Sequence, residues 1–336
     1  MGCGEECAMD SELRRDPVVA TRISIISRAR AKRPLRPDRA TCPFCPGNEH
    51  ATPPATLVVV EEGGRLAYER EERDERVRGW KIRIFPNKYP ALTPLSPECY
   101  GYHEVLVETP DHCRHPPDME LEEIALVFQA ALRRLRAIAE DEKIEQLLLF
   151  RNHGSLGGTS ISHPHSQIVA FPFVPPCLRE ELRYFEREYE RGGECPYCAL
   201  LERELRSPRL VYENGHFAVV AAYAPRAPFE LLIAPLDHQR SLLEMDAKDV
   251  YHFSDAYKAA LSALKEALGD PPYNLWFHTA PLRERVECYH WHVEVVPAVS
   301  IWAGVEKGAG VYLIGTPPEE AAEILRRRVA ESRLSG

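Results

Sequence analysis

One ordered set of motifs occurs twice in this 336-residue chain, and a duplication of this size constrains the fold more than any other feature. Each copy contains a C-x-x-C pair, a strand-like segment followed by Asp-His, an amphipathic helical segment, and an H-x-H motif that leads into an apolar strand. The Asp-His histidine precedes the first histidine of H-x-H by 51 residues in the first copy and by 52 in the second. Because strands and helices intermingle in each copy, we expect an α+β fold made of two related units.

The two copies divide the chain into four expected segments. These are an N-terminal arm with a first strand (1–40), a first unit (41–177), a linking helix (178–194) and a second unit (195–336). Apolar residues at helical spacing predict the main helix of the first unit near 118–140, with Asp118 as its N-cap, and that of the second unit from about Asp246. A strand over 311–314 and a helix from about Pro317 are expected to complete the chain.

Charge and hydropathy exclude several classes of protein. The net charge is −9, and acidic and basic residues are interleaved, which argues against an extended nucleic-acid groove or an anionic-membrane surface. No apolar run approaches the roughly 20 residues that span a bilayer. The N-terminal sequence MGCGEECAMD lacks the basic start and apolar core of a secretory signal. We therefore expect a cytoplasmic protein that binds neither nucleic acid nor membranes.

Cysteine and histidine recur at the spacing of metal sites. The first predicted site contains Cys42, Cys45, His112 and His163, and the second contains Cys195, Cys198, His238 and His290. Four protein ligands suit tetrahedral zinc and leave no open position, so we predict two closed, structural sites. A disulfide scaffold fits small secreted domains better than this chain. A redox dithiol and ordinary buried cysteines are the alternatives, but repetition of the whole set favours metal.

A glycine-rich loop and a histidine-containing strand adjoin in the segment from Phe150 to Phe171, FRNHGSLGGTSISHPHSQIVAF. Glycines let the backbone approach an anion closely, and the Thr159 and Ser160 hydroxyls can donate to phosphate oxygens. Because side chains alternate along a strand, His163, His165 and Gln167 are expected to share one face.

His165 is the candidate nucleophile, since His163 is assigned to the metal. A neutral imidazole attacks phosphorus readily near pH 7, and a covalent nucleotidyl-histidine divides one displacement into two. The Gln167 amide is expected to donate to a phosphate oxygen in the transition state. The second copy has His292 at the position of His165 but Glu294 in place of Gln167. A carboxylate repels phosphate, so His292 is expected to be structural.

These motifs resemble those of the galactose-1-phosphate uridylyltransferase family, a branch of the histidine-triad superfamily that carries two such units in tandem. The resemblance rests on SRARAKRP, CPFC, FPNKYPAL, ETPDH, FRNHGSLGGTSISHPHSQ, PFELLIAPLDH and HWHVEVVP, which span nearly the whole chain. It implies two histidine-triad-like units with a mixed or antiparallel sheet, and a homodimer whose active site lies at the interface. It further implies uridylyl transfer from UDP-glucose to galactose 1-phosphate through the histidine that aligns with His165.

The resemblance also assigns individual positions. It implies that Arg30 and Arg33 reach phosphate across the dimer interface, that Gln167 binds phosphate, and that the nucleotide is contacted by Asn87, Asn152, Gly158 and Ser160. Glu181 lies where some members supply a carboxylate to their second metal, but the CPYC pair makes that ligand unnecessary here. Zinc is expected in both sites, with iron as an alternative in the second.

Two departures from the family pattern leave the substrate open. Lys88 follows Asn87 where uridylyltransferases commonly have an aspartate, and GVEKGAGVYLI is unlike the galactose-recognising segment. Both features are closer to the related ADP-glucose phosphorylase branch, which transfers adenylyl groups. Uridylyl transfer is favoured, with adenylyl transfer and nucleotide hydrolysis as alternatives. A non-enzymatic binding module would not explain why His165, Gln167 and the glycine loop occur together.

Overall fold

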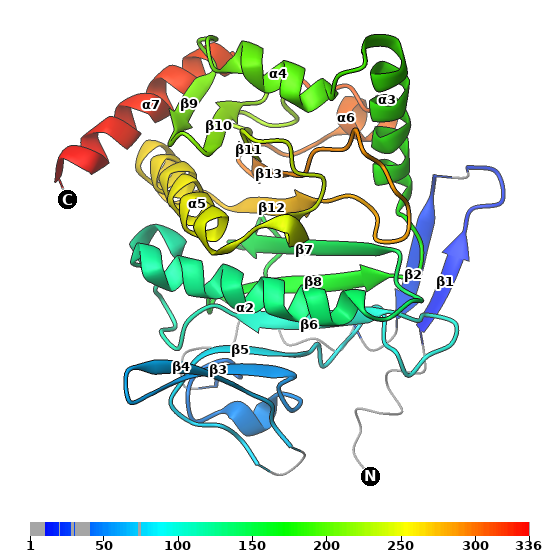
Figure 1. The fold of residues 1–336 in the computed structure, drawn as a ribbon, viewed down its shortest axis with the longest axis vertical. Helices are drawn as coiled ribbons and strands as arrows, with labels where there is room; N and C mark the ends of the chain where they lie inside the picture. The colour runs from blue at the N-terminus through cyan, green and yellow to red at the C-terminus, as the bar shows by residue number, and fades with distance from the viewer. Residues whose placement is uncertain (1–10, 20, 28–29, 31–40, 73–74, 336) are drawn as a thin grey trace.

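One antiparallel sheet of 11 strands forms the centre of the molecule (Figure 1). The computed structural model describes residues 11–19, 21–27, 30, 41–72 and 75–335. The strand order is β4-β3-β5-β6-β8-β7-β12-β13-β11-β10-β9, and neighbouring strands are antiparallel throughout. A separate hairpin pairs β1 (Ser11–Arg15) with β2 (Ile23–Ser27). The expected α+β class with packed helices is confirmed, and the pairing of the described strands is antiparallel rather than mixed.

The sheet joins six strands from the first half of the chain to five from the second. The first group consists of β3 (Leu57–Glu62), β4 (Arg65–Glu69), β5 (Trp80–Pro86), β6 (Tyr102–Val107), β7 (Gln146–His153) and β8 (His165–Phe171). The second consists of β9 (Leu210–Glu213), β10 (Phe217–Ala221), β11 (Leu231–Pro235), β12 (Tyr273–His278) and β13 (His292–Pro297). The helices are α2 (Leu121–Ala139), α3 (Pro176–Gly192), α4 (Pro196–Glu204), α5 (Ala247–Leu268), α6 (Gly304–Ala309) and α7 (Pro318–Ser335).

The two halves repeat one arrangement about the β7–β12 junction. Counting outward from that junction, β7-β8-β6-β5 on one side corresponds to β12-β13-β11-β10 on the other. Helices α2 and α5 cover the same face of the sheet (Figure 1), and the rings of Phe128 and Phe253 meet between them with centroids 4.8 Å apart. Buried residues from both halves belong to one hydrophobic core. This is the arrangement that a tandem duplication produces, although the division at 177 and 195 stays a prediction.

Helix ends follow local capping chemistry, and one expected cap is wrong. Asp246 caps α5 by accepting from the Asp249 backbone N–H, as expected. Helix α2 begins three residues later than Asp118, after a 3-10 turn, and Glu120 is its N-cap in a capping box with Glu123. Asp118 instead accepts from the ammonium group of Lys265 at 2.5 Å. The proline-rich turn Pro116–Asp118 delays the helix.

The strand expected over residues 311–314 does not form. These residues run irregularly between α6 and α7, and Leu313 is 67% exposed. A strand needs a free sheet edge to pair with. The edge formed by β9 is already occupied by α7. Arg326 of α7 donates to the carbonyl oxygens of Pro208 and Leu210 there. The helix expected from about Pro317 is confirmed as α7.

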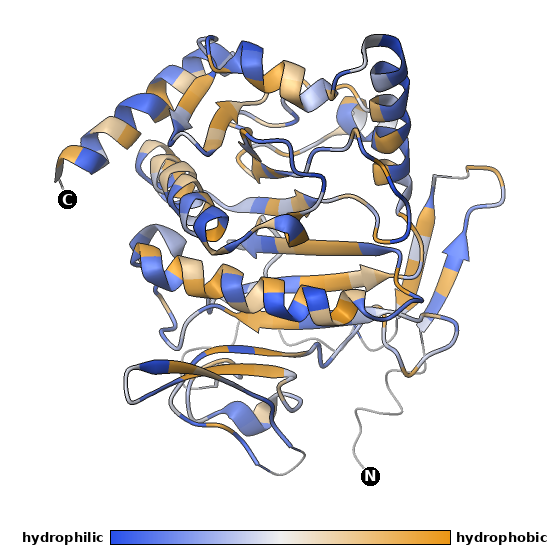
Figure 2. Cartoon of the chain, in the orientation of Figure 1, coloured by the Kyte–Doolittle hydropathy of each residue, from blue (hydrophilic) through white to orange (hydrophobic). Residues whose placement is uncertain are grey.

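Hydropathy follows this architecture. The sheet strands carry many of the hydrophobic residues, and the outward sides of α3 and α7 are largely hydrophilic (Figure 2). Within the residues described, no helix combines the length and apolar character needed to cross a membrane.

Candidate active site

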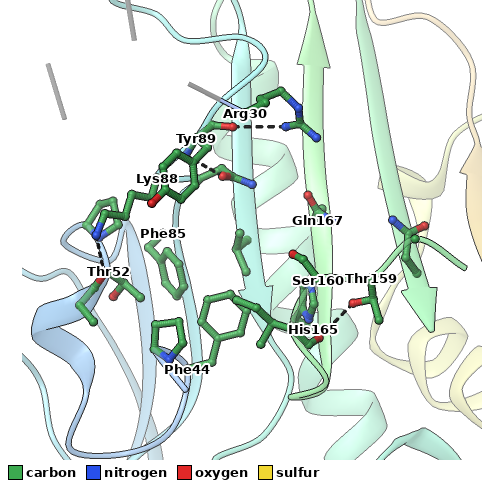
Figure 3. Close-up of a pocket in the computed structure, with 18 of the residues that line it drawn as sticks. Arg30, Phe44, Thr52, Phe85, Lys88, Tyr89, Thr159, Ser160, His165 and Gln167 are labelled. Atoms are coloured by element: carbon green, nitrogen blue, oxygen red, sulfur yellow. Dashed lines mark hydrogen bonds between the residues drawn. The ribbon is translucent and has the colours of Figure 1, made fainter. Parts of the chain in front are cut away.

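A cavity of about 510 Å³ lies on the face of the sheet opposite α2 (Figure 3). His165 and Gln167 line it from β8, whereas Ile168, on the alternate side of the strand, belongs to the core beneath α2. The substrate-binding positions expected from the sequence that also line it are Arg30, Asn87, Asn152, Gly158 and Ser160. Arg33 lies outside the described residues. The structure thus places side chains from the N-terminal segment, β5–β6 and the glycine loop around one nucleophile candidate.

The imidazole of His165 is oriented by the backbone two residues earlier. Its Nδ1 lies 2.8 Å from the His163 carbonyl oxygen. Because a carbonyl only accepts, the ring proton is on Nδ1 and the lone pair is on Nε2. Burial lowers the pKa of His165 below its ordinary value. A neutral imidazole with a free Nε2 is therefore favoured, which is the form required of a nucleophile.

The amide of Gln167 is oriented by a histidine that carried no prediction. The Ala91 backbone N–H donates to Nδ1 of His103 at 3.0 Å, so the proton of that ring is on Nε2. This Nε2–H donates to Oε1 of Gln167 at 2.9 Å. The NH2 group of Gln167 is then left for the cavity. A ligand there meets a hydrogen-bond donor, as expected for a phosphate contact.

His163 does not share a strand face with His165 and Gln167. Strand β8 begins at His165, where it pairs with Val107 of β6. Nε2 of His163 donates to the Thr109 carbonyl oxygen at 2.8 Å, which leaves Nδ1 facing the cysteines. The strand begins two residues after His163, so its side-chain alternation does not extend to that residue.

Tight packing holds the glycine loop against the second half of the chain. A Cβ atom at Gly157 would lie 2.2 Å from the carbonyl oxygen of His153 and 2.7 Å from that of Tyr273. Only glycine fits there. Gly158 has φ of +81°, a conformation that side chains rarely adopt, and it lines the cavity. Thr159 and Ser160 follow and line the same cavity, so the loop presents backbone and hydroxyl groups to a ligand.

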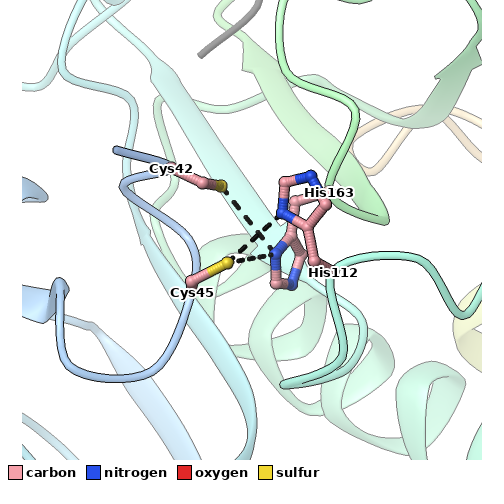
Figure 4. Close-up of side chains that lie close together, drawn as sticks. All are labelled: Cys42, Cys45, His112 and His163. Carbon is pink, nitrogen blue, oxygen red and sulfur yellow. Dashed lines mark hydrogen bonds between the residues drawn. The ribbon is translucent and has the colours of Figure 1, made fainter. Parts of the chain in front are cut away.

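The first predicted metal set comes together as four buried side chains, Cys42, Cys45, His112 and His163 (Figure 4). The Sγ-to-Nδ1 distances are 3.3 Å for Cys45–His112, 3.5 Å for Cys45–His163 and 3.9 Å for Cys42–His163. A tetrahedral zinc ion with bonds of about 2.3 Å to sulfur and 2.0–2.1 Å to nitrogen separates such atoms by about 3.6 Å. Burial lowers the pKa of His163 to about 4, so its imidazole is neutral. These residues fit zinc.

The second predicted set is also assembled, closer to the surface. It consists of Cys195, Cys198, His238 and His290. Nδ1 of His290 lies 3.4 Å from Sγ of Cys198 and 4.0 Å from that of Cys195, and Nδ1 of His238 lies 3.4 Å from Sγ of Cys198. The Nε2 atoms of His290 and His238 donate to the carbonyl oxygens of Pro235 and Glu287. Such bonds fix the tautomer that frees Nδ1 for a metal.

The position of the second copy that corresponds to the cavity is filled by charged side chains. The guanidinium group of Arg226 stacks on Trp276 and pairs with Glu294 at 2.9 Å. His278 donates from Nδ1 to Glu181 at 2.6 Å and accepts from Trp276 on Nε2 at 2.7 Å. The structural role expected for His292 stays a prediction.

Glu181, His278 and His292 also form a third group of potential metal ligands. Sequence reasoning kept Glu181 out of the second site and did not single out His278. Both nitrogens of His278 already have protein partners, as given above. In the sequence, this region was marked by His292 and Glu294 of the second H-x-H motif and by the resemblance at Glu181, but nothing there pointed to His278.

A buried ion pair beneath β8 also escaped prediction. Arg151 is 1% exposed, and its Nε lies 3.1 Å from Glu108. Glu108 accepts from Ser166 at 2.6 Å, and Arg151 donates to the Tyr273 hydroxyl at 2.6 Å. Ser166 lies between His165 and Gln167 on β8, and its hydroxyl ties that strand to this pair.

Comparisons with known proteins agree with this geometry. Residues 82–175 match the family model described as "Galactose-1-phosphate uridyl transferase, N-terminal domain". The chain is 32% identical to ADP-glucose phosphorylase of Arabidopsis thaliana, covering 94% of this chain and 92% of that protein. It is also 32% identical to galactose-1-phosphate uridylyltransferase of Thermotoga maritima, covering 95% and 99%.

Solved structures give the same result. The crystal structure of the Arabidopsis thaliana ADP-glucose phosphorylase with bound ADP-glucose superposes with a TM-score of 0.75 at 32% identity, covering 94% of this chain and 98% of that one. A structure described as uridylyltransferase superposes with a TM-score of 0.80 at 30% identity, covering 96% and 99%. The resemblance seen in the motifs is confirmed over nearly the full chain. The protein belongs to the galactose-1-phosphate uridylyltransferase family, and it is a nucleotidyltransferase of the hexose-1-phosphate class.

Proposed function

We propose that this chain transfers a uridylyl group from UDP-glucose to galactose 1-phosphate through a covalent intermediate on His165. The observation that supports this most is the fixed tautomer of His165, whose free Nε2 lines the cavity beside the Gln167 amide. Part of the cavity wall is apolar and suits a nucleobase; it includes Phe85 and Phe44, whose ring centroid lies 5.2 Å from that of His165. A nucleoside diphosphate sugar can place its base there and its α-phosphate at His165.

The proposed reaction has two balanced displacements. The Nε2 lone pair attacks the α-phosphorus, and the bond between that phosphorus and the bridging oxygen breaks, so glucose 1-phosphate leaves with the bonding electrons. The positive charge on the ring is stabilised by the Nδ1–H bond to the His163 carbonyl. A phosphate oxygen of galactose 1-phosphate then attacks the same phosphorus, and the P–Nε2 bond breaks. The Gln167 NH2 group and the glycine loop are proposed to stabilise the charge on the phosphate oxygens in both steps.

Zinc is proposed for both Cys₂His₂ groups, with iron as an alternative in the second. The eight side chains assigned to the two sites would hold the ions, which supply folding energy rather than chemistry because four protein ligands leave no open position.

A second candidate function is adenylyl transfer, as in an ADP-glucose phosphorylase. Lys88 favours it, since its ammonium group lies at the cavity wall, 3.4 Å from the Ala51 carbonyl oxygen. An ammonium group has no acceptor for a ribose or base hydroxyl or N–H. The similarity to the Arabidopsis thaliana enzyme supports the same alternative.

A matrix of donors and acceptors tests the proposed substrate. We expect kcat/KM for UDP-glucose with galactose 1-phosphate to exceed that for ADP-glucose with inorganic phosphate by at least about tenfold, or roughly 1.4 kcal/mol. Glucose 1-phosphate and water complete the set of acceptors. A preference for ADP-glucose with phosphate would establish the phosphorylase function, and discharge of the labelled enzyme by water as fast as by sugar phosphate would establish a hydrolase.

A homodimer is also proposed, on the basis of the family, and sedimentation velocity tests it. In the single chain, Arg30 lines its own cavity and donates to the Tyr89 carbonyl oxygen at 3.2 Å (Figure 3). We therefore expect that mixing Arg30→Ala chains with His165→Ala chains restores no activity. Recovery in the mixed dimer would instead mean that Arg30 completes the partner's site, as the resemblance implies.

A further inference from the structure

A residue of the second half of the chain contacts two parts of the nucleotide cavity in the first half. Asn274 lies on β12, directly opposite Asn152 of β7 in the strand register. Its Nδ2 atom lies 2.7 Å from Oδ1 of Asn152 and 2.7 Å from the carbonyl oxygen of Gly157. Asn152 lines the cavity, and Gly157 belongs to the glycine loop beside it.

The Gly157 carbonyl decides how both amides are oriented. A carbonyl oxygen can only accept, so the Asn274 atom that faces it must be the NH2 group. The same NH2 group faces Asn152, so the Asn152 atom at that contact must be its oxygen. The NH2 group of Asn152 is then the part of the side chain that remains for the cavity. A phosphate or ribose oxygen placed there would find a donor instead of a repelling acceptor.

The loop contact depends on the same residue. Gly157 is buried against the carbonyl oxygens of His153 and Tyr273, and a Cβ atom would clash with both. Gly154 is pressed against Pro272, two residues before Asn274, with 2.9 Å between the side chain of Pro272 and an added Cβ atom. His153 also contacts Asp270 at 3.1 Å. The turn before β12 and the start of β12 therefore support the loop, and Asn274 gives the contact that also reaches a cavity side chain.

We propose that Asn274 is a positioning residue for the nucleotide cavity, which directs the Asn152 NH2 group toward the ligand and holds the glycine loop at Gly157. The inference rests on the proposed function and deepens it. In this proposal, the second half of the chain takes a direct part in the reaction of the first half. The site in the second half that corresponds to the cavity is itself filled by Arg226 and Glu294.

Substitution of Asn274 tests this proposal by donor binding and by adduct formation. Asn274→Ala should lower kcat/KM for UDP-glucose at least about tenfold, the effect of one or two lost hydrogen bonds. Asn274→Asp should lower it at least about hundredfold, because a carboxylate cannot donate to either oxygen and would turn the Asn152 amide, displacing a ligand-binding group. Calorimetry with UDP-glucose and ADP-glucose in the His165→Ala background should give weaker binding for both variants.

A double-mutant cycle separates positioning from general stabilisation. If Asn274 acts through Asn152 and the loop, Asn152→Ala combined with Asn274→Ala should bind donor within about threefold of the weaker single variant. Independent, multiplicative effects would overturn the proposal, as would an Asn274→Asp chain with unchanged donor affinity and kcat/KM. Asn274→Ser, which keeps one hydroxyl donor, should fall between the parent and Asn274→Ala.

Asn214 provides the matched control. Its Nδ2 also bridges two acceptors, the His252 carbonyl oxygen and Asp255, each at 2.8 Å, and it does not line the cavity. Asn214→Asp should leave donor affinity and adduct formation unchanged, whereas comparable losses in Asn214→Asp and Asn274→Asp would overturn the positioning role.

A parent chain that binds donor but never forms an adduct would refute the proposed function alone, and one that binds neither donor would refute both.

Discussion

Replacement of His165 by alanine is expected to abolish nucleotidyl transfer, lowering kcat by at least about four orders of magnitude. The substitution removes the Nε2 lone pair that the His163 carbonyl keeps available, and with it the covalent intermediate. The parent chain, mixed with UDP-glucose, should carry an adduct that is labile to acid and stable to base, as a phosphoramidate is. Mass mapping of peptides after rapid quenching measures the adduct directly.

His292 is the internal comparison for this prediction. It repeats the geometry of His165, with Nδ1 3.1 Å from the His290 carbonyl oxygen, and burial lowers its pKa as well. Nε2 of His292, however, lies 3.6 Å from the carboxylate of Glu181, which would repel a phosphate. The label should therefore be found on His165 and not on His292. A label on His292, or transfer that survives in a folded His165→Ala chain with normal metal content, would refute the assignment.

The parts of this molecule that the sequence predicts are those in which one local pattern must satisfy one strong physical demand. A tetrahedral ion needs four ligands, so the repeated cysteine and histidine spacing indicated which distant segments meet. A loop that approaches phosphate needs glycine, so the segment before His165 was recognisable. Capping chemistry likewise placed the start of α5 at Asp246.

The parts that the sequence did not predict depend on contacts between segments with no shared pattern. Glu108 and Arg151 are a fully buried pair, yet each reads as an ordinary charged residue on a strand end. The contact between Asn274 and Gly157 joins residues 117 positions apart. The strand expected over 311–314 is absent for the same reason. Its run of apolar residues is visible in the local sequence, but whether a sheet edge is free to pair with it depends on distant segments.

Loss of either Cys₂His₂ site is expected to destabilise the protein strongly. Cys42→Ala and Cys195→Ala should each lose one equivalent of metal and lower the Tm by at least about 10 °C, since structural zinc contributes folding energy directly. At about 2–4 °C per kcal/mol, the range for domains of about 150–250 residues, that shift corresponds to roughly 2.5–5 kcal/mol. Elemental analysis of protein purified without chelator and differential scanning calorimetry measure the two quantities.

Cys99 separates the effect of the metal from that of removing a buried sulfur. Its side chain is 1% exposed, as deeply buried as Cys42, but it belongs to neither metal group. Cys99→Ala should keep full metal content and lower the Tm by only a few degrees, the cost of a small cavity. Because Cys195 lies in the half of the chain that does not contain His165, Cys195→Ala should still form the His165 adduct at the parent rate per folded molecule. A Cys42→Ala chain that loses metal yet melts where the parent does would show that the site is not structural.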